Sequence, residues 1–146
     1  MNRKIGIIIS SILIISFFSI YVVQAKPKAE STTEVYSEFL SFEPTSTSLV
    51  SAIYEPDGPK VVSAWVLADD QIESGDVFVI HSVWYNGKYV EDEGSSINNG
   101  RIYAPNRGQL VLNRISIADP IEIKLYRNQD VGGDIDTLEV QWIIEG

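Results

Sequence analysis

The sequence predicts an all-β protein, an antiparallel β-sandwich that follows an N-terminal signal peptide helix. Short segments rich in Val, Ile, Tyr, Phe and Trp alternate with turn-forming clusters of Gly, Asn, Asp and Pro. Beyond residue 25, no window sustains the apolar spacing of an amphipathic helix. Alternation at this density is typical of a sandwich or small barrel. The expected strands are 34–43, 48–54, 60–68, 76–85, 88–92, 100–104, 109–117, 120–127 and 137–144.

The N-terminal segment has the three-part layout of an export signal. Arg3 and Lys4 precede an uncharged run over 5–23, and Val23 and Ala25 provide small residues before a cleavage point. Residues 1–25 are therefore interpreted as a cleaved signal peptide. The alternative is an uncleaved anchor, since about 20 apolar residues span a bilayer. The expected location is secreted or anchored on the outer face of the cytoplasmic membrane, with membrane contact only through an uncleaved leader.

Composition limits the classes of partner. Residues 26–33 are polar and contain Pro, which indicates a flexible linker, and 34–146 have the length of a single β-sandwich domain. Eleven Lys and Arg against 20 Asp and Glu give a net charge of −9. Nucleic acid is excluded as a partner because no basic stripe is visible. The chain has no Cys, so disulfides cannot stabilise it.

The middle of the chain carries the clearest local signal. Residues 77–85 are apolar on both faces, as in a strand at the centre of a sandwich, whereas 121–126 alternate and leave one face in water. Asn86-Gly87 between two strands predicts a hairpin with a type I′ turn. This aromatic strand, Asn-Gly-Lys turn and following strand resemble the middle strands of immunoglobulin-like modules. The resemblance implies an immunoglobulin-like or related sandwich.

An acidic loop over 128–139 is the candidate metal site. Asp130, Asp134 and Asp136 stand among flexible glycines, and Ca²⁺ prefers six to eight oxygen ligands. The spacing is not that of an EF-hand. The competing interpretation is a Gly-Gly turn that uses Asp for its geometry. No resident cofactor is expected, and calcium is the one candidate ion.

A second acidic cluster precedes the central strand. It contains Asp69, Asp70, Glu73 and Asp76. These side chains are candidates for loops that face a carbohydrate or a cation. The competing interpretation, without a ligand, is a set of solvated turns and charges that protect strand edges.

The sequence predicts that the protein is not an enzyme. His81 is the only histidine, and its apolar neighbours indicate a packed, hydrogen-bonded side chain. A His-dependent nucleophile would need a Ser or Cys partner and an orienting acid. The chain has no Cys and no G-x-S-x-G segment.

Aromatic residues are the remaining functional signal. Tyr85 and Tyr89 flank the Asn-Gly turn and Tyr103 precedes Pro105, so these tyrosines are candidate binding residues. The expected function is an exported, non-catalytic binding or interaction module for an unknown protein or carbohydrate ligand. The alternative is a small secreted effector, meaning a toxin, a membrane-active protein or its inhibitor, which could depend on calcium.

Overall fold

The structure, a computed structural model, describes residues 30–91 and 96–146. The described chain is all-β, and the nine expected strands are confirmed, with ends that shift by up to two residues. Their bounds are β1 (Thr33–Phe42), β2 (Val50–Tyr54), β3 (Lys60–Ala68), β4 (Val77–Tyr85), β5 (Lys88–Val90), β6 (Arg101–Tyr103), β7 (Arg107–Ile117), β8 (Ile121–Gln129) and β9 (Asp136–Glu145).

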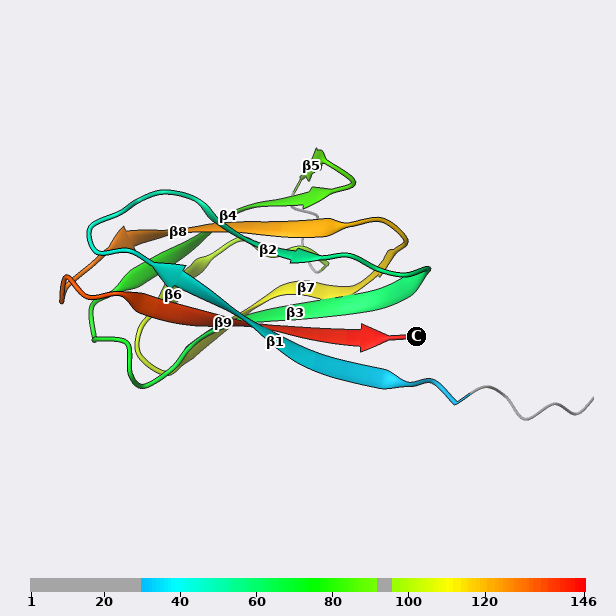
Figure 1. Cartoon of the computed structure of the whole chain (residues 1–146), viewed down its shortest axis with the longest axis horizontal. Coiled ribbons are helices and arrows are strands. Elements are labelled where there is room, and N and C mark those ends of the chain that lie inside the picture. Colours follow the sequence, from blue (N-terminus) through cyan, green and yellow to red (C-terminus); the bar gives the residue numbers. More distant parts are fainter. Residues whose placement is uncertain (1–29, 92–95) are drawn as a thin grey trace, which may run out of the picture. The chain divides into compact units, whose positions relative to one another are not determined.

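The strands form two antiparallel sheets that face each other (Figure 1). Sheet A has the order β1-β9-β3-β7, and sheet B has the order β2-β8-β4-β5, with β6 also paired to β4. β1 runs beside β9 over its whole length, from the Thr33–Glu145 pair to the Phe42–Asp136 pair. The β-sandwich that the sequence predicts is therefore confirmed.

The order of the strands defines the type of sandwich. The chain changes sheet at every connection except those among β4, β5 and β6, and both sheets combine early and late strands. This is the double-sheet arrangement of a jelly roll. In an immunoglobulin sandwich the first two strands belong to the same sheet, whereas β1 and β2 lie in different sheets here. The strand order therefore does not confirm the immunoglobulin-like subtype.

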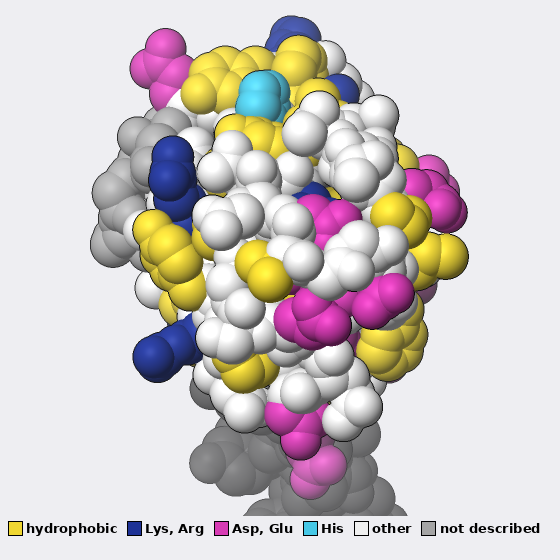
Figure 2. All heavy atoms as spheres, turned by 90° about the vertical axis from the view of Figure 1, so that its left-hand side faces the viewer, with side chains coloured by type: hydrophobic (Ala, Val, Ile, Leu, Met, Phe, Trp, Pro, Cys, Tyr) yellow, Lys and Arg dark blue, Asp and Glu magenta, His cyan; other side chains and the backbone are white. Residues whose placement is uncertain are grey.

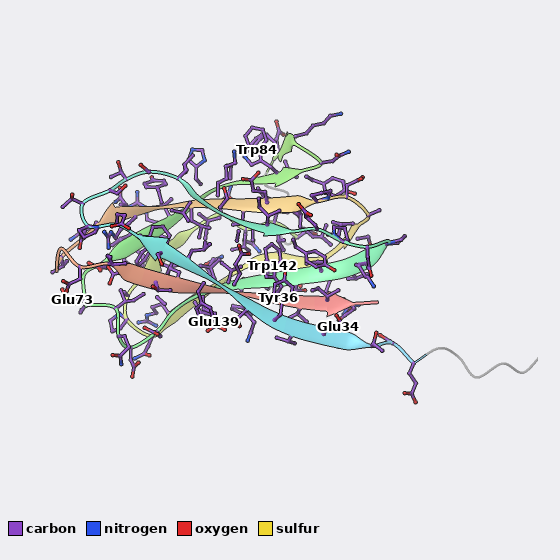
Figure 3. The ribbon with its side chains drawn as sticks, in the orientation of Figure 1. Glu34, Tyr36, Glu73, Trp84, Glu139 and Trp142 are labelled. Atoms are coloured by element: carbon purple, nitrogen blue, oxygen red, sulfur yellow. The ribbon has the colours of Figure 1, made fainter. Side chains whose placement is uncertain are left out.

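One core fills the space between the sheets. Alternate residues of β3, β8 and β9 are buried, which produces the regular inward pattern expected for strands with one wet face. Trp142 is fully buried in this core. Its ring stacks on Tyr36 at 6.4 Å between centroids, and Tyr36 itself is 40% exposed on the edge strand β1 (Figure 3). Residues 31–146 form one compact unit with its own core, so we expect this part to fold alone.

The predicted hairpin is confirmed. β4 and β5 pair antiparallel across Asn86 and Gly87, whose φ angles are 49° and 72°. Positive φ at both central residues is the signature of a type I′ turn, and its twist matches that of the flanking strands. The turn thereby brings Tyr89 opposite Trp84.

The predicted leader over 1–25 lies outside the described residues, as do residues 26–29, the first half of the predicted linker over 26–33. Among the residues that are described, no helix is long and apolar enough to cross a membrane.

Candidate functional site

The outer side of sheet B is defined by the alternation of its strands. On β8, four buried side chains point into the core, and the residues between them, Glu122, Lys124 and Tyr126, point outward. Residues directly opposite each other in an antiparallel pair share a side of the sheet. Trp84 of β4 pairs with Glu122, so its indole also points outward.

The same rule places four aromatic rings on that outer side, and a β-bulge adds one imidazole. Tyr89 of β5 pairs with Trp84, and Arg101 of β6 pairs with Val79 of β4, which in turn pairs with Tyr126. Tyr103, two residues beyond Arg101, shares its side of β6. We call this set the aromatic face; its members are His81, Trp84, Tyr89, Tyr103 and Tyr126.

Trp84 is held in place from several directions. Its Nε1 donates a hydrogen bond to Ser82 Oγ at 2.9 Å. Lys124 Nζ lies 4.5 Å from the ring centroid, within the range of a cation–π contact. The ring of Tyr89 meets Trp84 edge-on at 5.9 Å. The side chain stands on the side of β4 that faces away from sheet A (Figure 3). Trp84 is thus a fixed ring at the centre of the aromatic face, and more exposed rings lie beside it.

His81 is exposed, so the prediction that it packs in the core is wrong. The physical reason is a β-bulge between Ile80 and Ser82, which inserts His81 as an extra residue and turns its side chain outward. The predicted hydrogen bond is present, because Nδ1 lies 2.9 Å from Ser82 Oγ. The ring also meets Tyr126 edge-on at 6.2 Å. Figure 2 shows the histidine among hydrophobic side chains at the upper edge of the molecule.

The structure brings two of the three predicted tyrosines onto this face. Tyr89 and Tyr103 are 53% and 56% exposed. Tyr85 is instead half-buried against the core, and its hydroxyl accepts a hydrogen bond from Ala118 N at 3.1 Å. It lines two open cavities of 510 and 330 Å³ that the aromatic face does not share. Sequence reasoning missed Trp84 and Tyr126, although the alternation in 121–126 already pointed Tyr126 to solvent.

A second group of functional side chains lies at one end of the sandwich. One carboxylate oxygen from each of Asp76, Asp130 and Asp136 lies within 4.8 Å of the others. The register explains this, because Val77 at the start of β4 pairs with Gln129 at the end of β8. Asp76 and Asp130, the next residues outward, are thus brought together, and Asp136 begins β9. Figure 2 shows acidic side chains gathered on this end.

Arg127 is the counter-charge of these carboxylates. The guanidinium is 1% exposed and contacts Asp136 Oδ2 at 2.6 Å and Asp130 Oδ2 at 3.1 Å. It also donates to the backbone carbonyl oxygens of Glu43 and Asp134. We call Asp76, Asp130, Asp136 and Arg127 the acidic end cluster. It ties the β1–β2 and β8–β9 loops to the end of sheet B.

The predicted metal residues separate in the structure. Asp130 and Asp136 converge, whereas the carboxylate of Asp134 lies outside the group and Asp76 takes its place. The interpretation of Asp76 as a solvated turn residue is wrong, because Asp76 is only 1% exposed. Asp69, Asp70 and Glu73 are exposed, as that interpretation expected.

The three carboxyl groups differ in their electrostatics. Burial and the facing Asp76 carboxyl together raise the pKa of Asp136 to about 6, against the lowering effect of Arg127. Backbone amides act in the opposite direction on Asp130. Thr45 N and Gly133 N each donate to its carboxylate at 2.9 Å and lower its pKa. The ionised form is therefore favoured at Asp130 and disfavoured at Asp136.

The strand order defines the protein only at the level of its fold, a jelly-roll β-sandwich. No family model matches the chain, and no curated protein matches it. A solved structure of Bacillus endospore appendages, described as a novel family of disulfide-linked pili, is 10% identical with a TM-score of 0.39. It covers 83% of this chain and 93% of that chain. The infectious bursal disease virus Gt strain is 11% identical with a TM-score of 0.30, over 80% of this chain and 33% of that one. Neither likeness carries a functional argument.

Proposed function

We propose that the protein is an exported, non-catalytic binding module whose ligand is a polysaccharide that lies across the aromatic face. The observation that carries this proposal is the position of Tyr89 and Tyr103. Both rings are more than half exposed on the same outer side of sheet B. Exposed tyrosine presents an apolar ring with a polar tip at little cost in conformational entropy, which suits a ligand with both kinds of surface.

The groups between the two tyrosines favour a sugar polymer over a purely apolar partner. Sugar rings have apolar C–H faces and polar edges, and this face interleaves aromatic rings with hydrogen-bonding side chains. Lys124 and Arg101 supply donors, and Ser51 Oγ donates to Glu122 at 2.6 Å on the neighbouring strand pair. Two cations against one acid make this face less acidic than a chain of net charge −9. Carboxylated sugars are therefore the preferred ligands.

The contacts of His81 support a non-catalytic role. Ser82 is the hydroxyl beside its imidazole, but that residue is 2% exposed and its Oγ also accepts from the Trp84 indole. A buried hydroxyl beneath an indole gives a substrate carbonyl no approach. None of the contacts described for His81 involves a carboxylate that would orient the ring as in a catalytic triad.

Export is the part of the proposal that rests on the N-terminal pattern of residues 1–25. A secreted module would meet polysaccharides at the cell surface or in the medium. The secreted-effector alternative stays a prediction, and no observation on residues 30–91 and 96–146 favours it.

The test is a binding titration with matched variants. The chain from residue 26 onward is titrated with a panel of neutral and carboxylated polysaccharides, followed by Trp fluorescence and calorimetry. Tyr89→Ala and Tyr103→Ala should each weaken binding about tenfold, which corresponds to about 1.4 kcal/mol for a buried aromatic contact.

Phe39→Ala is the matched control, because Phe39 is 64% exposed on sheet A. It should leave the affinity unchanged. Absence of binding across the panel, or equal losses in all three variants, would contradict the proposal.

A further inference from the structure

We propose that Asp76, Asp130 and Asp136 together bind one calcium ion at the end of the sandwich. This site is separate from the aromatic face and does not depend on the proposed function. Its geometry is the approach of three carboxylate oxygens to within 4.8 Å of one another. Oxygens bound to one Ca²⁺ at about 2.3–2.6 Å lie within such distances of each other.

An unpartnered buried oxygen points to the ion. Asp76 is 1% exposed, and its Oδ1 accepts a hydrogen bond from Val131 N at 2.6 Å. Its Oδ2 is buried and has no hydrogen-bond partner in the described structure. A buried carboxylate oxygen without a partner is costly, because it has lost water and gained nothing in return. A cation bound between Asp76 and its two neighbours removes that cost.

The charges of the cluster lead to the same conclusion. Three carboxylates face the single guanidinium of Arg127, which leaves two negative charges uncompensated. Glu73 adds to the negative potential, since its carboxylate packs against Gly132 of the same loop, in the space that a side chain there would fill. One divalent cation would neutralise the two uncompensated negative charges. Carboxylate oxygens favour Ca²⁺ and Mg²⁺, and the irregular ligand set of two loops suits the less demanding geometry of Ca²⁺.

Arg127 limits the affinity without blocking the site. Its guanidinium contacts the Oδ2 atoms of Asp136 and Asp130, and therefore leaves Asp76 Oδ2 uncovered. Repulsion between this cation and Ca²⁺ weakens binding. We expect a dissociation constant in the range of extracellular modules, about 10⁻⁴–10⁻³ M.

The experiment compares thermal unfolding of the chain from residue 26 onward in 10 mM CaCl₂, 10 mM MgCl₂ and EDTA. Calcium should raise the Tm by on the order of 5–10 °C, because an ion that binds only the folded state stabilises it. Magnesium should raise it less. Equilibrium dialysis with CaCl₂ should show one ion per chain.

Two substitutions locate the ion. Asp76→Asn should remove the calcium-dependent shift, whereas Asp134→Asn, in the same loop but outside the carboxylate group, should keep it. If Asp76→Asn does not fold, Asp130→Asn takes its place and the dialysis of the unaltered chain still decides. No calcium binding, a shift that survives both cluster substitutions, or a shift that Asp134→Asn abolishes would overturn the site.

Discussion

The aromatic face and the acidic end cluster belong to the same sandwich but differ in how far their side chains are exposed to solvent. The aromatic face consists of strand residues that alternation turns outward, and its rings are open to solvent. The acidic end cluster consists of residues at strand ends, and Asp76 and Arg127 are each 1% exposed. Exposed side chains can be substituted at little cost in stability, whereas a buried charge needs an opposite charge or hydrogen-bond partners beside it. We therefore propose the face as a site for a large ligand and the cluster as a structural site for an ion.

The largest expected effect is on the buried arginine. Arg127→Met should destabilise the fold by about 3–5 kcal/mol, because it leaves three carboxylates without their counter-charge. Urea unfolding measures the change. Arg114→Met is the control, since Arg114 pairs with Glu145 at 2.6 Å but its side chain is 64% exposed. That loss should stay below about 1 kcal/mol. Equal losses would show that burial does not distinguish these two ion pairs.

The second expected effect is a pH dependence of the cluster in the presence of EDTA. The pKa of Asp136 is about 6 in the folded chain against an ordinary value of 3.8, with Asp76 and Arg127 facing it. The folded state thus holds an extra proton between these values. The resulting stability is complete below pH 3.8 and is lost as the pH rises through 6. The loss should be on the order of 1–2 kcal/mol.

Urea unfolding of the unaltered chain and of Asp136→Asn, from pH 4 to pH 7, isolates this contribution. The difference between the two curves should fall with rising pH. A difference that is constant or rises across this window would contradict the assignment to Asp136.

An effect of similar size is expected at the turn that carries Tyr89 to the aromatic face. Gly87 has a φ of 72°, so Gly87→Ala should cost about 1–2 kcal/mol of stability. Gly87→Asn should cost less, because Asn visits this conformation more readily. Thermal unfolding ranks the two. If both substitutions cost the same, backbone strain is not the cause.

The smallest expected effect is on the face itself. Tyr89→Ala and Tyr103→Ala should change the free energy of unfolding by at most about 0.5–1 kcal/mol, since both rings are more than half exposed. Guanidinium unfolding provides the value. Losses of several kcal/mol would mean that these rings hold the sheet together and are not held available for a ligand.

Much of the fold could be predicted because period-two patterning is local. The alternation in 121–126 and the Asn86-Gly87 turn each specify their own conformation, and both are confirmed. The pairing of strands was beyond such reasoning. That β1 lies beside β9 and not beside β2 depends on contacts about a hundred residues apart along the chain.

The site could be predicted only where its residues are neighbours in the sequence. Asp130 and Asp136 share a loop and were found together. Asp76 was assigned to a separate acidic cluster, because the pairing of Val77 with Gln129, which brings it to the loop, joins strands that are far apart in the sequence. His81 was placed wrongly because a bulge resets the alternation of β4, and the apolar run around it gave no sign of the extra residue.

The central claim is that the two regions are separate binding sites, and amide chemical-shift mapping tests it most directly. The ¹⁵N-labelled chain from residue 26 onward is titrated first with CaCl₂ and then with the best polysaccharide of the panel. Calcium should shift amides around Asp76 and in the loop from Asp130 to Asp136. The polysaccharide should shift amides of β4, β5, β6 and β8 around the aromatic face. Polysaccharide shifts confined to sheet A, or calcium shifts spread over the aromatic face, would contradict the account.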